Sequence, residues 1–173
     1  MVAWWMAVIR HAVPEDLPAL TAIYNHYIVH TPITFDVTTY EPEQRRQWFD
    51  EHAPAGRHRL IVAEEHGAVA GYASTSRWRP KAAYETTVES SVYVRADAVG
   101  RGIGRELYAA LFDVIANEDV HTAVAGVALP NAASIALHER FGFRQVGVFR
   151  DVGRKFGKYW DVAWFQRTCE RRT

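Results

Sequence analysis

The chain has 173 residues, a length that buries a full core without disulfide cross-links, so one domain over residues 1–173 is the simplest expectation. Its 20 Lys and Arg residues balance 20 Asp and Glu residues, which excludes the charge surplus expected of a nucleic-acid-binding or membrane-surface protein. The single cysteine, Cys169, excludes an internal disulfide and favours the reducing conditions of the cytoplasm.

The first part of the chain predicts a strand followed by two helices. Residues 1–9, MVAWWMAVI, are too few to span a bilayer and lead into a strand around residues 7–10. Pro14 begins a segment with two acids in its first turn and apolar residues at helical spacing, which indicates a helix to about residue 28. After a loop interrupted by prolines, a second helix is predicted near residues 43–52.

The middle of the chain changes from helical to strand-like patterns. Residues 60–78 predict two strands around a turn at residues 66–67, and residues 86–94 predict a further strand. A glycine-rich turn at residues 100–104 then leads into an amphipathic helix that ends near residue 117.

The last part predicts a strand at residues 121–128, a helix and two more strands. Asn131 is suited to cap the helix and Gly142 to end it, and the strands follow at residues 145–152 and 159–166. The order β-α-α-β-β-β-α-β-α-β-β predicts an α/β fold with one mixed sheet and helices on its faces.

The turn between strand and helix, GRGIG, has the character of a phosphate site. Gly100, Gly102 and Gly104 let the main chain approach a ligand, and the positive end of the helix lies behind them, with Arg101 and Arg105 free to add charge. A plain connecting turn is the alternative. A Rossmann dinucleotide site is disfavoured because Arg occupies the third glycine position, and a Walker A loop lacks its lysine.

Longer stretches resemble a known family. Residues 93–107, YVRADAVGRGIGREL, are similar to the acetyl-CoA-binding turn of GNAT acetyltransferases, and residues 131–143, NAASIALHERFGF, to the second cofactor motif of that superfamily. NHYI with TPITF, TVESSVYV and KYWDVAWFQR resemble the phosphinothricin N-acetyltransferases and their relatives acting on methionine sulfoximine and methionine sulfone. The likeness covers about residues 8–168. Val99 departs from the family, which has Gln or Arg there, and is expected to cost some cofactor affinity at most.

The resemblance implies the fold and the cofactor. It predicts a GNAT fold with a mixed, mostly antiparallel central sheet of about seven strands flanked by about four helices. Acetyl-CoA is the expected cosubstrate and no metal is expected. Strand backbone would pair with the pantetheine arm, the glycine turn would wrap the pyrophosphate, and Asn131 would help hold the arm. The residues assigned to acetyl-CoA are Val92, Tyr93, Val94, Gly100, Arg101, Gly102, Ile103, Gly104, Arg105 and Asn131.

Amide formation from an amine and a thioester needs a base, because an α-ammonium is largely protonated at neutral pH. Glu89 lies on the strand that would hold the cofactor and is assigned as this base by the resemblance; a solvated strand carboxylate is the alternative. His138 stands where most GNAT enzymes have Tyr, and we expect it to be the general acid or a proton shuttle with Glu89 rather than a surface histidine. A main-chain N–H near Val92 or Tyr93 is the expected oxyanion donor.

The segment SRWRPKAAYE, residues 76–85, concentrates cations and aromatic rings that suit an anionic acceptor, although a solvated basic loop is the alternative. The residues that the resemblance assigns to the acceptor are Phe35, Arg79, Lys81, Tyr84 and Thr87. Trp160 and Trp164 could close the pocket or pack at a dimer interface, and a homodimer is implied by the resemblance alone.

The expected reaction is direct transfer of the acetyl group to the α-amine of phosphinothricin, with methionine sulfoximine, methionine sulfone or another amino-acid analogue as the alternative acceptor. The sequence does not discriminate among these head groups. Acetylation of a protein N-terminus or an aminoglycoside, and a CoA-binding sensor without turnover, are weaker alternatives. The basic loop disfavours a polycationic acceptor, and the presence of both Glu89 and His138 disfavours a sensor.

Overall fold

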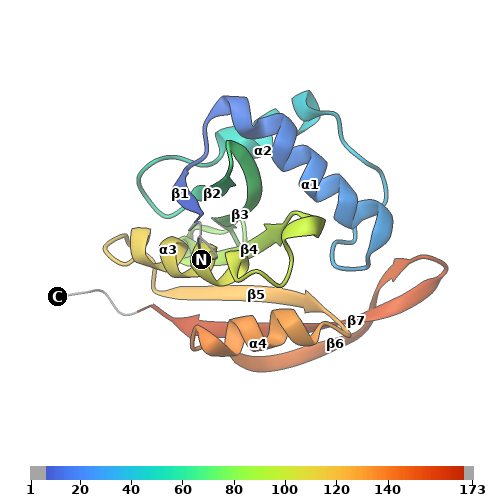
Figure 1. Ribbon diagram of the computed structural model, residues 1–173. Helices are drawn as coiled ribbons and strands as arrows, with labels where there is room; N and C mark the ends of the chain where they lie inside the picture. The colour runs from blue at the N-terminus through green and yellow to red at the C-terminus, as the bar shows by residue number, and fades with distance from the viewer. Residues whose placement is uncertain (1–6, 170–173) are drawn as a thin grey trace, which may run out of the picture.

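Seven strands form one sheet in the order β1-β2-β3-β4-β5-β7-β6 in the computed structural model, which describes residues 7–169 (Figure 1). Neighbouring strands are antiparallel except for β4 and β5, which run parallel. The strands are β1 (Val8–His11), β2 (Leu60–Glu65), β3 (Ala68–Arg77), β4 (Thr87–Val94), β5 (Thr122–Ala128), β6 (Arg144–Lys155) and β7 (Lys158–Thr168). The helices are α1 (Leu17–His30), α2 (Arg46–Asp50), α3 (Ile103–Val114) and α4 (Ala132–Arg140), with short 3-10 turns such as η2 (Pro42–Arg45) and η3 (Ala82–Tyr84).

This architecture confirms the predicted fold class and order of elements. His66 and Gly67 form the turn between β2 and β3 with φ of 52° and 76°, and Asn131 caps α4. Several boundaries differ from the prediction by a few residues, and two of the differences have a clear structural cause. The second helix has a 3-10 first turn, so its α-helical part is only five residues long. Strand β6 is longer than predicted because a bulge between Phe149 and Gly153 interrupts its alternating pattern without ending the pairing with β7.

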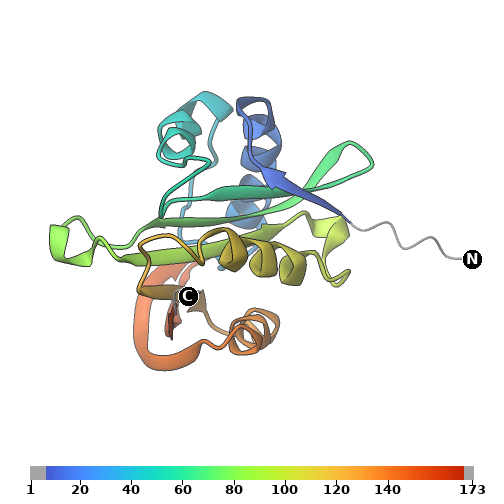
Figure 2. The ribbon, with the colours of Figure 1, turned by 90° about the vertical axis from the view of Figure 1, so that its left-hand side faces the viewer.

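Helices cover both faces of the sheet (Figure 2). Successive side chains of a strand point to opposite sides, so alternate residues of β2 pack on opposite faces of the sheet. Leu60 and Val62 pack with α1 and α2, whereas Ile61 and Ala63 pack with α3. A third cluster beneath β5 and β7 includes Val88, Ile115, Val120, Ala123, Ala125, Val127, Phe143, Ala163 and Phe165.

The parallel pairing of β4 with β5 is short. It joins only Thr87, Val88 and Glu89 to Thr122–Val124, after which β4 continues beside β3 and β5 continues beside β7. The backbone of β4 beyond Glu89 therefore has no β5 partner. The opening between these two strands is the part of the fold that positions the site.

No helix within residues 7–169 has the length and hydropathy that a membrane crossing requires.

Candidate active site

The glycine turn presents unpaired N–H groups at the start of α3. Gly100 and Gly102 have φ of +82° and +89°, the left-handed region that glycine adopts without strain, and Gly102 is the N-cap of α3. The first N–H group of α3 to find a partner in the helix is that of Arg105, which donates to the Gly102 carbonyl at 3.0 Å, so those of Ile103 and Gly104 have none, and no side chain of the described residues caps α3. This end of the helix is therefore built to receive an anion.

The two arginines of the turn differ in their surroundings. The Arg101 guanidinium lies 2.9 Å from Oε1 of Glu65, at the end of β2, whereas Arg105 is exposed in the first turn of α3. Ile103 is buried and anchors the helix, and Gly104 lies near side chains of both Val94 and Leu137. The turn thus lies between β4 and α4, beside the opening in the sheet.

The three predicted cofactor residues on β4 do not all direct their main-chain groups to the same side of the strand. The N–H of Arg95 donates to the Ala70 carbonyl at 2.8 Å, and backbone groups alternate sides along a strand, so those of Tyr93 also face β3. Val92 and Val94 then face the opening, where the Val94 carbonyl accepts a hydrogen bond from the Tyr27 hydroxyl at 2.7 Å. Val92 keeps both of its main-chain groups directed to the opening.

Asn131 follows β5 and holds the start of α4. Its Oδ1 accepts a hydrogen bond from the N–H of Ser134 at 3.1 Å. The cap fixes the entry to α4 at the side of the opening opposite β4.

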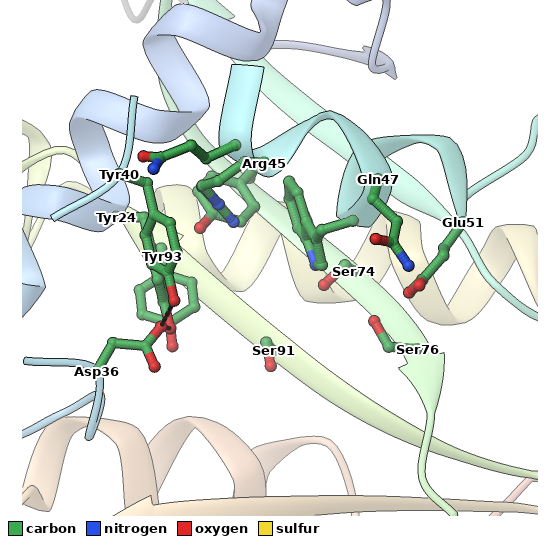
Figure 3. Close-up of a pocket in the computed structure, with 13 residues that line it drawn as sticks. Tyr24, Asp36, Tyr40, Arg45, Gln47, Glu51, Ser74, Ser76, Ser91 and Tyr93 are labelled. Carbon is green, nitrogen blue, oxygen red and sulfur yellow. Dashed lines mark hydrogen bonds between the residues drawn. The ribbon is translucent and has the colours of Figure 1, made fainter. Parts of the chain in front are cut away.

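A cavity of about 380 Å³ lies on the face of the sheet covered by α1 and α2 (Figure 3). Ser74 and Ser91, from β3 and β4, form part of its sheet side, and Figure 3 shows Arg45, Gln47 and Glu51 lying over them from the helical side. The cavity is lined by Tyr24, Asp36, Tyr40, Gln44, Arg45, Gln47, Trp48, Glu51, Tyr72, Ser74, Ser76, Ser91 and Tyr93.

Of the predicted site residues, the side chain of Tyr93 lines this cavity. Sequence reasoning did not single out the other lining residues. The alternation of serines in β3 and the clustered aromatic residues of α1 are the signals that could have drawn attention to this face.

Glu89 does not line this cavity itself, but it lies on the same face of the sheet, next to two positions that do. It lies directly opposite Ser76 on β3 and two residues before Ser91, so its side chain is on the cavity face of β4. The carboxyl group is half-buried, and burial raises its pKa above the ordinary value, with the nearby Arg79 charge opposing the shift. A carboxylate of raised pKa beside a cavity is suited to accept a proton.

His138 is buried on the other face of the sheet, with 4% of its surface exposed. Its Nδ1 lies 2.7 Å from the Ser134 carbonyl, which can only accept, so Nδ1 carries a proton. Its Nε2 lies 3.0 Å from the Tyr108 hydroxyl, which therefore donates to it in the neutral imidazole. Burial lowers the pKa of His138, which favours that neutral form.

The structure does not bring Glu89 and His138 together. Ser90, next to Glu89 in β4, points to the opposite face and lies 3.3 Å from the Tyr108 hydroxyl. Glu89 thus faces the cavity, whereas Ser90, Tyr108 and His138 form a buried hydrogen-bonded chain on the far side of the sheet. Any proton exchange between Glu89 and His138 would have to cross the opening beside β4.

The predicted acceptor residues are spread over two sites. Arg79, Lys81 and Tyr84 lie on the exposed segment between β3 and β4, where the Trp78 ring is 5.1 Å from the Tyr84 ring. Arg79 is close enough to act on the charge of Glu89, but none of the three lines the cavity. This segment contributes charge at the Glu89 end of the site.

Neither Phe35 nor Thr87 lines the cavity. Thr87 is on the same face of β4 as Glu89, two residues before it. Phe35 packs on β6 at Gly153, where a Cβ atom would overlap its ring. Gly153 thus allows the loop after α1 to lie directly against β6.

Known proteins resemble this chain over nearly its whole length. The family described as "Acetyltransferase (GNAT) domain" matches residues 9–164. A phosphinothricin N-acetyltransferase of Streptomyces coelicolor is 56% identical over 161 residues, which cover 92% of this chain and 94% of that protein. An L-methionine sulfoximine/L-methionine sulfone acetyltransferase of Pseudomonas paraeruginosa is 41% identical over 160 residues, covering 92% of this chain and 93% of that protein.

Among solved structures, a GNAT superfamily phosphinothricin acetyltransferase from Sinorhizobium meliloti, in complex with AcCoA, aligns with a TM-score of 0.90 at 31% identity. The alignment covers 97% of this chain and 91% of that chain. The sheet and the order of helices are thus those of the GNAT fold. The chain belongs to the GNAT acetyltransferase family.

Proposed function

We propose that this acetyltransferase transfers the acetyl group of acetyl-CoA to the α-amine of phosphinothricin. The observation that carries the proposal is the position of Glu89, a half-buried carboxyl group of raised pKa between the acceptor cavity and the opening in the sheet. Relatives named for phosphinothricin and for methionine sulfoximine support an amino-acid analogue as acceptor.

Acetyl-CoA fits the opening between β4 and β5. The pyrophosphate would accept hydrogen bonds from the N–H groups at the start of α3, with Arg105 adding a positive charge. An amide N–H of the pantetheine arm would donate to the Val92 carbonyl, as an added strand pairs with a sheet edge, which leaves the Val92 N–H free for the reacting carbonyl. Because Val92 and Glu89 lie on the same strand, β4, an arm held at Val92 would place the thioester near Glu89.

In the proposed reaction, Glu89 takes a proton from the bound α-ammonium, directly or through a water. The free amine attacks the thioester carbonyl, and the N–H of Val92 donates to the oxyanion that forms. Collapse of the tetrahedral intermediate breaks the carbon–sulfur bond and releases the CoA thiolate. We assign the proton that this thiolate requires to the hydrogen-bonded pair of His138 and Tyr108.

The name of one relative supports a second class of acceptor. The relative that acts on methionine sulfoximine and methionine sulfone shares 41% of aligned residues over almost its full length. The sulfoximine and sulfone head groups, like the phosphinate of phosphinothricin, present oxygen acceptors on a tetrahedral centre. The same cavity therefore suits them.

The test is release of CoA by the purified full-length chain with phosphinothricin, methionine sulfoximine, methionine sulfone and unmodified methionine. The proposal expects the highest kcat/KM for phosphinothricin and no turnover without an acceptor. Turnover that is absent for every amino-acid analogue, despite tight acetyl-CoA binding, would refute it and leave a cofactor-binding protein.

We also propose a homodimer. Strand β6 is at the edge of the sheet, and Val146, Phe149 and Val152 on it are more than half exposed, at 61%, 56% and 55%. An unpaired apolar edge is a common site of association between copies of a chain. Light scattering after size-exclusion chromatography tests this, because a monomer at micromolar concentration would contradict it.

A further inference from the structure

Arg45 is a buried cation that faces the acceptor cavity. It ends the 3-10 turn η2 and is only 6% exposed. Its guanidinium lies 4.4 Å from the ring centroid of Tyr24 and 3.9 Å from that of Trp48. These rings hold the guanidinium in place, and Figure 3 shows it over the strands that form the sheet side of the cavity.

Arg45 has no anionic partner among residues 7–169, since none of the ion pairs found there includes it. One of its N–H groups donates to the Leu20 carbonyl at 3.2 Å. A guanidinium has five N–H donors, and a buried charge without a counter-ion is costly. The position of Arg45 is therefore suited to an anion that arrives with a ligand.

Tyr72 adds an unsatisfied donor to the same wall. Its side chain is 1% exposed and lines the cavity, and no group in the part of the chain described accepts a hydrogen bond from its hydroxyl. A buried O–H without an acceptor costs free energy that a bound acceptor atom would recover. The Arg45 guanidinium is near enough that its charge and its N–H groups act on the hydroxyl oxygen, opposing the rise in pKa, to about 12, that burial causes.

The acidic residues of the cavity, Asp36 and Glu51, form no ion pair with Arg45. Asp36 accepts hydrogen bonds from the hydroxyls of Tyr24 at 2.7 Å and Tyr40 at 3.2 Å, and its charge also acts on the buried Lys155. Glu51 lines the cavity from the end of α2.

The distance along β4 between the levels of Glu89 and Tyr72 determines which part of the acceptor molecule would reach Arg45. Tyr72 is opposite Tyr93, and Glu89 is opposite Ser76, so the two levels are separated by four residues of β4, roughly 13 Å. The α-carboxylate of an amino acid is bonded to the same carbon as the amine and must remain near Glu89. Only the far end of the acceptor side chain extends toward Tyr72.

We propose that Arg45 and Tyr72 bind the distal head group of the acceptor, and that this subsite selects an anionic tetrahedral head with oxygen acceptors, such as a phosphinate. The inference rests on the proposed function and specifies which part of the acceptor this wall of the cavity recognises. The α-carboxylate is left to the basic segment around Arg79, which acts on Glu89.

The test compares three acceptors with the full-length enzyme and its Arg45→Gln variant: phosphinothricin, with a charged head; methionine sulfone, with neutral oxygens; and methionine, with no oxygens. Loss of charged hydrogen bonds is expected to raise KM for phosphinothricin roughly 10- to 100-fold, with a smaller rise for methionine sulfone and little change for methionine. Tyr72→Phe is expected to raise KM for both oxygen-bearing acceptors roughly 3- to 10-fold.

Arg46→Gln is the matched control, because Arg46 is the next residue and does not line the cavity. It should leave all three acceptors unchanged. Arg45→Lys keeps the charge without the planar fork and should fall between wild type and Arg45→Gln. An unchanged Kd for acetyl-CoA shows that each variant is folded. An equal loss with all three acceptors would overturn the inference, because Arg45 would then hold the α-carboxylate or only support the fold.

Calorimetry separates failure of this inference from failure of the proposed function. Phosphinothricin is titrated into wild type, Arg45→Gln and Arg46→Gln without acetyl-CoA. Binding that Arg45→Gln alone abolishes supports the subsite even if no acceptor is turned over. Binding to Arg45→Gln with wild-type affinity, or no binding to wild type, overturns it.

Discussion

The Tyr108 hydroxyl lies 3.0 Å from Nε2 of His138, and both side chains are buried beneath the sheet. Because Nδ1 of His138 already donates to the Ser134 carbonyl, both ring nitrogens have protein partners. Burial lowers the pKa of His138, which favours the neutral ring, and the Ser134 carbonyl holds its proton on Nδ1.

Tyr108→Phe removes the donor to Nε2 and is expected to lower kcat roughly 10- to 100-fold while leaving KM for acetyl-CoA unchanged. Steady-state kinetics measure both constants. Ser90→Ala is the control, since it keeps the contact between Tyr108 and His138 and removes the 3.3 Å contact on the other side of the hydroxyl, together with the Ser90 hydrogen bond to the Val124 carbonyl. A kcat equal to wild type in Tyr108→Phe would show that this pair supplies no proton.

The buried His138 should make stability depend on pH. Its pKa in the folded protein is lowered from the ordinary 6.5 by burial, so below that pH the unfolded chain binds a proton that the folded chain does not. The stabilisation that neutral His138 provides is fully present above pH 6.5, and it is lost as the pH falls toward the pKa of His138 in the folded protein. Urea unfolding between pH 5 and 8 measures it.

The matched variant is His138→Gln, whose stability should depend less steeply on pH over that range. His52 and His58 also have pKa values lowered by burial and remain in both proteins, so the difference isolates His138. Identical slopes for the two proteins would contradict the prediction.

Glu89→Gln should abolish the base. At neutral pH the expected loss in kcat is roughly 10²- to 10⁴-fold, and the loss should shrink at high pH, where the free amine is abundant. Because burial raises the pKa of Glu89, the acid limb of the wild-type profile should lie above the ordinary 4.5. A pH–rate profile of unchanged shape in the variant would argue against this role.

The glycine turn offers a matched pair of substitutions. Gly102→Ala places a side chain at φ +89° and should weaken acetyl-CoA binding while costing about 1 kcal/mol of stability. Gly104→Ala adds a Cβ whose nearest neighbours are at 3.7 Å, and should stabilise the ligand-free helix by up to about 1 kcal/mol. Thermal unfolding and calorimetry with acetyl-CoA check both, and equal effects would refute the conformational argument.

Gly153→Ala should displace Phe35. The added Cβ would overlap the ring, and overpacking of this kind costs about 1–3 kcal/mol. We expect a lower Tm and a raised KM for the acceptor, because the loop after α1 also carries Asp36 into the cavity. Gly147→Ala on the same strand, where a Cβ has no neighbour within 4 Å, is the control and should leave KM unchanged.

The order of elements could be predicted because each has a local signal. The cap at Asn131, the turn at His66 and Gly67 and the glycines before α3 depend on neighbouring residues alone. The end of β6 could not be predicted in this way, because its bulge depends on the pairing with β7.

The candidate site was only partly predictable for the same reason. Glu89 could be placed on a strand beside the cofactor, but its separation from His138 follows from which face each side chain occupies after folding. Arg45 and Tyr72 come from distant segments whose proximity no local pattern records. The basic segment around Arg79 drew attention through its composition, yet the cavity lies elsewhere on the same face.

The short pairing between β4 and β5 has a mechanical consequence. Three residue pairs join these strands, whereas β3 pairs with β4, and β5 with β7, over seven each. Few backbone hydrogen bonds therefore resist a change in angle between the two halves of the sheet, and each half is stiff in itself. Any bending between the two halves would centre on Thr87–Glu89, so the proton acceptor of the proposed reaction lies at the axis, where such bending would move it least.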